Sequence, residues 1–377
     1  MELERHIKEL AACEPKDAPF ISLYLDTRPT GEPGKHPYEI FLKNRLHFFQ
    51  REFEDSGERE VQFKQAWERI ATYLEHELQQ NVHGVALFSR AQPEDDFFLA
   101  LEFPRPFENR FVVDSVPHIF PLVQFLDHSH HYLVMVSDSE KAKLFEIQFG
   151  SIQDVREIER SEAEKSFRGE WAQMHYQNWK KDQTKKFVKQ KVKILTDLME
   201  QRGIRHLILA GDEVTLAQIK KELPKWVQDR VVDFTRLDPH VENHAVLRQT
   251  LETFANYERN EQLDTLAVLR RELYADGLGV VGTEPTVEAL NAGQVDRLIM
   301  AEAYQAPPGW RCQNCESLYV GPEVGPCKYC GQTTFQAVDL REELIRKTVL
   351  SGARVETIAE NPWFVRQGGV GALLRFR

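Results

Sequence analysis

The chain has 377 residues, of which 42% are hydrophobic, and a formal net charge of −11 at pH 7. This length and apolar content suffice for two or three domains with cores of their own, and no apolar run approaches the roughly 18 residues of a transmembrane helix. The net negative charge excludes a protein that covers nucleic acid through its overall charge, so any contact with RNA requires a local basic surface.

The first part of the chain, to about residue 127, has the pattern of a mixed α/β domain. Ile21, Leu23 and Leu25 alternate with other residues as in a half-buried strand, and a loop rich in turn-forming residues follows at 29–37. The other elements expected in this region are helices at 38–54 and 61–80 and strands at 84–89 and 97–103.

The second part of the chain alternates strands and helices. The expected elements are strands at 131–137 and 141–148, a polar stretch at 161–183, a helix at 184–201, a buried strand at 206–210, a helix at 214–223 and a long helical segment at 241–274. Alternation of this kind predicts a largely parallel or mixed sheet with helices packed on it.

Four cysteines form two C-x-x-C pairs in the last third of the chain: Cys312 with Cys315, and Cys327 with Cys330. Each pair puts two thiols on one tight turn, and two such turns complete the tetrahedral S4 set that structural Zn²⁺ prefers. The alternatives are two disulfides or four free thiols. Cys13 is the only other cysteine, and nothing at the N-terminus has the pattern of a secretory signal, so we expect a reducing, cytoplasmic compartment.

The cysteine pairs lie inside an α/β pattern that continues on both sides of them. Before them stand residues 289–298 (ALNAGQVDRL); after them come a helix expected at 338–350 and residues 368–375 (GGVGALLR). This combination resembles the C-terminal domain of the archaeal and eukaryotic translation release factor and Pelota superfamily, in which zinc-ribbon insertions occur. Residues 21–26, 84–89 and 207–211 resemble the bacterial branch of that superfamily.

The resemblance implies an α/β (α+β) protein of three domains. These are an N-terminal mixed α/β domain at 1–127, a ribonuclease-H-like middle domain at 128–262, and an α/β domain at 263–377 with a zinc ribbon inserted at 309–336. It also implies a catalytic-type loop at 161–183 in the middle domain, where release factors carry a Gly-Gly-Gln motif.

In that loop the motif is altered. Gly169 is kept, Glu170 replaces the second glycine, and the nearest glutamine is Gln173. The resemblance implies that Gln173 positions a water molecule at the ester joining peptide and transfer RNA, and that Gly169 shapes the loop. Glutamine cannot act as a base, so such a role is positional and electrostatic. The alternative is a loop without a hydrolytic role, in which His175 is a polar side chain rather than a general acid or base.

A basic run follows the loop, with seven lysines and one aspartate between residues 180 and 193. On a helix, Val188, Val192, Leu195 and Met199 form a buried stripe. Lys185, Lys189 and Lys193 then lie on one exposed flank, with Lys186 beside them, and such a flank suits a phosphate backbone. Aromatic residues upstream can stack on bases. The alternative is a solvated face with its aromatics in the core. The candidate RNA-binding residues are Lys180, Lys181, Lys185, Lys186, Lys189 and Lys193, with Trp171 and Tyr176 before them.

The resemblance predicts a release-factor-like protein that hydrolyses peptidyl-tRNA. Because the first domain lacks the Asn-Ile-Lys-Ser sequence with which the family reads stop codons, we expect rescue of stalled ribosomes rather than normal termination. The expected partners are the ribosome with its tRNA and rRNA, and a translational GTPase or splitting factor, without a membrane. Two alternatives stay open. One is a non-catalytic Pelota-like factor, which Glu170 favours, and the other is a tRNA-acting nuclease, which requires clustered carboxylates or a pair of histidines that the sequence does not identify.

Overall fold

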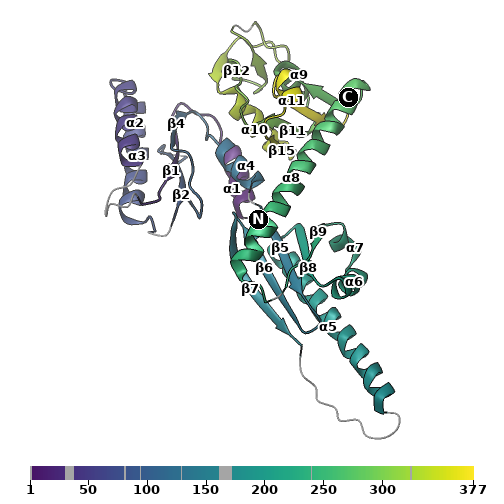
Figure 1. The fold of residues 1–377 in the computed structure, drawn as a ribbon. Coiled ribbons are helices and arrows are strands. Elements are labelled where there is room, and N and C mark those ends of the chain that lie inside the picture. Colours follow the sequence, from purple (N-terminus) through teal and green to yellow (C-terminus); the bar gives the residue numbers. More distant parts are fainter. Residues whose placement is uncertain are drawn as a thin grey trace. The chain divides into compact units, whose positions relative to one another are not determined.

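The computed structural model describes residues 2–29, 38–79, 82–93, 95–128, 130–160, 172–238, 240–322 and 325–377, without the side chains of 172–178, 180 and 181 (Figure 1). The chain divides into two compact units. One unit, residues 128–265, is continuous in sequence. The other combines residues 1–127 with residues 266–377, and we call it the split unit.

The N-terminal part of the split unit is a four-stranded antiparallel sheet in the order β3-β2-β1-β4. Alternation along β1 places Ile21 and Leu23 on the face covered by α2 and α3, and Phe20 and Tyr24 on the opposite face. The elements are α1 Glu2–Ala11, β1 Phe20–Asp26, α2 Tyr38–Glu52, α3 Glu58–His76, β2 Gly84–Arg90, β3 Phe97–Phe103, β4 Arg110–Asp114 and α4 Phe120–Asp127.

The C-terminal part of the split unit is a mixed sheet in the order β10-β16-β11-β15, with a small three-stranded sheet, β13-β12-β14, inserted after β11. We call this insertion the ribbon. The elements are β10 Gly279–Val281, α9 Thr283–Asn291, β11 Val295–Ala301, β12 Gly309–Cys312, β13 Leu318–Val320, β14 Phe335–Val338, α10 Leu340–Leu350, β15 Arg354–Ile358, α11 Pro362–Arg366 and β16 Val370–Leu374.

One hydrophobic core joins the two parts of the split unit. Ile7 and Leu10 of α1 and Phe120 of α4 belong to the same buried cluster as Leu344 and Ile345 of α10. Residues from the two ends of the chain therefore contribute to a single core.

The continuous unit is a five-stranded sheet in the order β7-β6-β5-β8-β9, with β5, β8 and β9 parallel. On β5, Leu133 and Met135 pack against α5 and α6, whereas Tyr132 and Val134 pack with residues of α8 such as Phe254. The elements are β5 Tyr132–Ser137, β6 Lys141–Gln148, β7 Ser151–Glu159, α5 Ala172–Arg202, β8 His206–Gly211, α6 Glu213–Glu222, α7 Lys225–Gln228, β9 Val231–Thr235 and α8 Asn243–Tyr274, which continues past residue 265 into the split unit.

The structure confirms the expected α/β class and most elements, and it corrects one of them. Helix α5 begins at Ala172, so the second half of the segment expected as a loop at 161–183 is helical. Residues 161–171 lie outside the described residues. The division into three domains at 127 and 262 stays a prediction.

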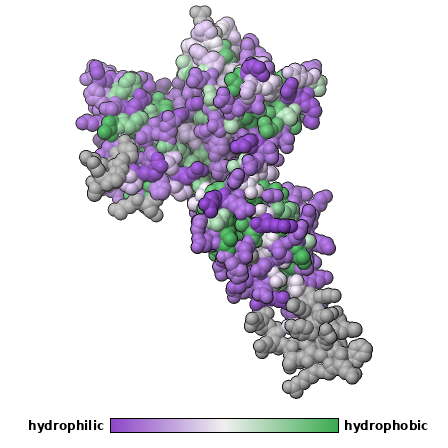
Figure 2. Space-filling model, in the orientation of Figure 1, coloured by the Kyte–Doolittle hydropathy of each residue, from purple (hydrophilic) through white to green (hydrophobic). Residues whose placement is uncertain are grey.

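The visible surface is mostly hydrophilic, with hydrophobic side chains in small groups (Figure 2). Within the described ranges, no helix combines the length and the hydrophobicity needed to cross a membrane.

Candidate functional site

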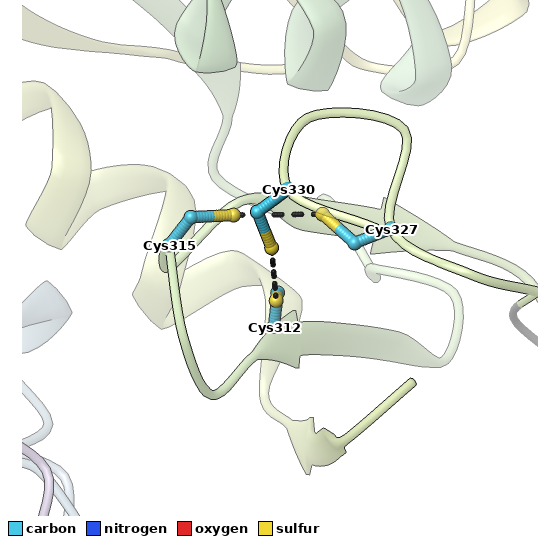
Figure 3. A group of neighbouring side chains, drawn as sticks. All are labelled: Cys312, Cys315, Cys327 and Cys330. Carbon is cyan, nitrogen blue, oxygen red and sulfur yellow. Dashed lines mark hydrogen bonds between the residues drawn. The ribbon is translucent and has the colours of Figure 1, made fainter. Parts of the chain in front are cut away.

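The four cysteines converge on one point of the ribbon, with their sulfur atoms directed toward one another (Figure 3). All four Sγ atoms lie within 4.8 Å of one another, with 3.6 Å between those of Cys312 and Cys330 and 3.5 Å between those of Cys315 and Cys327. A disulfide requires about 2.05 Å. Thiolates around a tetrahedral ion at Zn–S distances of about 2.3 Å lie about 3.8 Å apart. The donor set and its spacing therefore fit a bound metal ion.

Hydrogen bonds favour the ionised form of two of these cysteines. A hydrogen bond between the Sγ of Cys315 and the Oγ of Ser317, 3.3 Å long, lowers the pKa of Cys315. Burial opposes ionisation of Cys327, but the Tyr319 hydroxyl, which donates to its Sγ over 3.1 Å, and nearby backbone N–H groups lower the pKa to about 6. Because the thiolate is the form that binds a metal, these contacts favour metal binding at Cys315 and Cys327. The pKa of Cys330 is instead raised to about 11, with burial and the neighbouring Cys315 and Cys327 among the causes.

Two helices hold the first cysteine turn in place. Asn291, at the end of α9, accepts a hydrogen bond from the backbone N–H of Leu318 over 2.9 Å and donates one to its carbonyl oxygen over 2.8 Å. Lys347 of α10 donates to the backbone oxygen of Glu316 over 3.1 Å. The ribbon is therefore attached to the body of the C-terminal part at side chains outside its own small sheet.

The residues carried over from the family motif are largely outside the described part of the chain. Gly169 and Trp171 lie in the stretch 161–171. Gln173 and Tyr176 lie in the first turns of α5, where the backbone is described and the side chains are not. The catalytic role of Gln173 therefore stays a prediction. The side chains of Lys180 and Lys181 are likewise outside the described part of the structure.

Further along α5, the expected division into two faces is confirmed. Val188, Val192, Leu195 and Met199 are buried. The lysines expected on the flank are exposed, and we call them the lysine flank: Lys185, Lys186, Lys189 and Lys193. This arrangement leaves four positive charges available to a partner, and their contact with RNA stays a prediction.

One lysine of the basic run, Lys191, is fully buried, and its sequence context did not set it apart from its neighbours. Lys191 donates from Nζ to the Oγ of Ser137 over 2.9 Å and to the backbone oxygen of Asp138 over 2.6 Å, and its ammonium lies 3.9 Å from the ring centre of Phe187. Burial lowers its pKa to about 8, although the charges of Asp138 and Asp212 oppose this. The sequence feature that indicates its burial is its position on α5, one turn after Phe187 and beside the apolar residues of the buried stripe.

Lys191 lies where two parallel strands end. β5 ends at Ser137 opposite Gly211, the last residue of β8, so Asp138 and Asp212 follow at one edge of the sheet. The two strands approach closely there, since a Cβ at Gly211 would lie 1.9 Å from the Ser137 carbonyl oxygen. Ligand sites of α/β sheets occur at such edges.

The two aspartates at this edge are already engaged by backbone groups. The Oδ1 of Asp138 accepts hydrogen bonds from the N–H groups of Glu140 and Lys141, each over 2.7 Å, and Asp212 caps α6 by accepting from Thr215 over 2.9 Å. Among the described residues, the four cysteines are the only group of three or more side chains placed to hold a metal ion. Within the described ranges, this edge has no cluster of three or more carboxylates.

Comparison with known proteins gives matches of both sequence and structure. Residues 117–255 match the family model described as Bacterial archaeo-eukaryotic release factor family 10. The whole chain aligns with peptide chain release factor subunit 1 of Thermococcus kodakarensis at 23% identity over 410 residues, covering 100% of this chain and 97% of the relative.

Two solved structures illustrate the structural matches. The crystal structure of the archaeal translation termination factor aRF1 is 17% identical, with a TM-score of 0.26, and covers 100% of this chain and 97% of its own. Dom34 of S. cerevisiae, described as a translation termination-like factor, is 10% identical, with a TM-score of 0.45, and covers 78% of this chain and 79% of its own.

Proposed function

Since this chain is a release-factor-like protein, as its motifs predicted, we propose that it acts at the ribosome. The observation that carries the proposal is the alignment of the entire chain with peptide chain release factor subunit 1, with almost all of that protein covered. The family match at 117–255 adds support, because it spans most of the continuous unit that contains α5.

We propose rescue of stalled ribosomes as the specific task. The N-terminal part contains no Asn-Ile-Lys-Ser sequence, so nothing of the family's stop-codon reading motif is present in it. A factor that binds the ribosome without reading a stop codon can act on ribosomes that have stalled at other positions of an mRNA. As partners we propose tRNA and rRNA at the lysine flank, and a translational GTPase or splitting factor.

For the reaction, we propose hydrolysis of the ester between peptide and tRNA. Gln173, near the start of α5, would hold a water molecule against the ester carbonyl through its side-chain amide. The amide removes no proton, so its contribution is orientation, with the proton passing to the ribose oxygen that leaves. Gly169 would allow the preceding backbone to approach the tRNA end closely.

A second candidate function is a non-catalytic, Pelota-like factor that occupies the same site. Glu170 favours it, because a carboxylate in place of the second glycine restricts the backbone and repels RNA phosphates. A nuclease is disfavoured by the edge of the continuous unit, where Asp138 and Asp212 bind backbone N–H groups and Lys191 places a cation beside them.

For the cysteine centre we propose Zn²⁺ as the ion. Four thiolates and no nitrogen or oxygen ligand suit zinc, and they leave no coordination position for water or substrate. The ion would therefore stabilise the ribbon without taking part in hydrolysis.

The test uses stalled ribosomes that carry labelled peptidyl-tRNA, mixed with the full-length protein. Q173A is the variant, and Q177A, one turn later on α5, is its matched control. Release of peptide by the wild type and Q177A but not Q173A, with equal co-sedimentation, supports hydrolysis. Co-sedimentation without release by any of the proteins supports the Pelota-like function. Shortened tRNA 3′ ends indicate a nuclease, and failure to bind ribosomes overturns the proposal as a whole.

A further inference from the structure

A buried polar seam runs between the N-terminal and C-terminal parts of the split unit, and α10 lies at its centre. Glu342 of α10 is 2% exposed, and its Oε2 accepts hydrogen bonds from the backbone N–H groups of Ile119 over 2.9 Å and Phe120 over 3.0 Å. These are the free N–H groups at the start of α4. A side chain of the C-terminal part therefore caps a helix of the N-terminal part.

His118 adds a charged contact to the same seam. Its Nε2 lies 3.1 Å from Oδ2 of Asp114, and its Nδ1 lies 3.5 Å from Oε1 of Glu342. Burial disfavours the imidazolium, but the two carboxylates outweigh burial and raise the pKa of His118 to about 10. A cation of the N-terminal part is thus held between carboxylates of both parts.

The next carboxylate on α10 connects the seam to the ribbon. Glu343, also 2% exposed, accepts from Arg311 on one side and from Arg346 on the other, over 2.5 and 3.4 Å. Arg346 donates to the backbone oxygen of Ala11 over 3.0 Å and to that of Cys13 over 3.4 Å. Glu343 is therefore shared between the ribbon and an arginine that holds the end of α1.

The ribbon also contacts the N-terminal part through a second path. Arg311, which directly precedes the metal-ligand candidate Cys312, is 2% exposed and donates to Oε1 of Gln336 over 2.8 Å. Gln336 in turn donates from Nε2 to the Oγ of Ser115 over 3.1 Å. A path of two hydrogen bonds thus leads from the residue beside the cysteine centre to the N-terminal part.

We propose that the ribbon is a metal-dependent latch, in which a tetrahedral thiolate-binding divalent ion keeps residues 2–13 and 115–127 docked on α10. The three short strands of the ribbon add little to the main core beyond Leu318 and Val320, so the ion supplies much of the order that keeps Arg311 and Gln336 in place. When the ion leaves, Arg311 moves away from Glu343. The cost of a buried carboxylate that has lost one of its cations then weakens the seam.

The test is amide hydrogen exchange on the full-length protein, with and without a chelator. Metal removal should raise exchange at residues 115–127 and 2–13 by about tenfold or more, since charge-assisted hydrogen bonds are lost there. Strands β1, β5 and β8 should keep their protection. C315S/C330S should behave like the chelated protein, whereas K328S, an exposed substitution between two ligands, should behave like the wild type.

A second variant separates the latch from metal-dependent folding. R311M should retain about one equivalent of metal and still raise exchange at residues 115–127. Unchanged protection there in both R311M and the metal-free protein overturns the latch. A rise that includes β1 in the metal-free protein also overturns it, because the ion would then be required for the fold of the whole split unit. None of these measurements involves a ribosome, so the outcome is independent of the proposed function.

Discussion

Replacement of Lys191 by methionine should change the stability of the continuous unit in a way that depends on pH. Methionine keeps an unbranched stem beside Phe187 and removes the ammonium that donates to Ser137 and Asp138. In the wild type, the pKa of Lys191 is lowered from 10.5 to about 8. The folded state therefore binds fewer protons than the unfolded state between these pH values, and wild-type stability rises as pH increases through this window.

The magnitude follows from the same pKa. Below about pH 8 both states are protonated, so the penalty for a buried charge is fully present, and K191M should differ little from wild type at pH 7 because it loses hydrogen bonds but also avoids this penalty. Between pH 7 and 9.5 the wild type should gain about 2 kcal/mol that K191M cannot gain.

Amide exchange of β5 and β8 measures this difference, because comparison of two proteins at one pH cancels the intrinsic rate. The ratio of K191M to wild-type exchange should grow by about 30-fold from pH 7 to 9.5, which corresponds to about 2 kcal/mol. K193M, on the exposed flank of the same helix, should show no such change. An equal ratio for K191M at both pH values would refute the buried-ammonium reasoning.

Metal content, surface charge and backbone geometry give three further predictions. Protein purified under reducing conditions should carry about one zinc per chain; less than half an equivalent by elemental analysis contradicts the zinc site. K185E/K189E/K193E should weaken ribosome binding and reduce the salt dependence by about 2–3 log units per log of salt; a slope equal to that of K220E/K221E/K225E, the same charge change on α6 and α7, argues against RNA contact. G211A should destabilise the continuous unit by more than about 3 kcal/mol, because the backbone has φ of +145° and no room beside Ser137. G150A, with φ of +70° and open space, should cost only about 1 kcal/mol, and similar exchange changes in both variants would contradict this.

The features predicted well from the sequence depend on residues close together in the chain. Strands such as β3 and β6 were predicted to the residue, because alternation and turn residues are local signals. The cysteine centre could be predicted for the same reason, since each C-x-x-C pair fixes its own turn. On α5, the spacing of apolar residues predicted which lysines are exposed.

The errors and omissions have different physical causes. In the first turns of α5 only Ala172, Tyr176 and Trp179 recur at helical spacing, among polar and charged residues, so periodicity gave a weak signal for a helix before residue 184. Lys191 was grouped with its neighbours because composition does not show which lysine faces the sheet. The seam could not be predicted at all: Glu342 and Phe120 are separated by 222 residues, and no local pattern pairs them.

The split unit also has a consequence for the order in which the protein folds during its synthesis. Residues 128–265 are contiguous and can bury their core once they leave the ribosome, whereas Ile7 and Leu10 must wait for α10. About 340 residues separate Leu10 from the end of α10, so at synthesis rates of about 5–20 residues per second the wait is on the order of 20–70 s. For that interval the apolar faces of α1 and α4 stay exposed on the nascent chain, where a holding chaperone can bind them. A ribosome that halts before α10 emerges leaves the protein with its first and last parts unjoined.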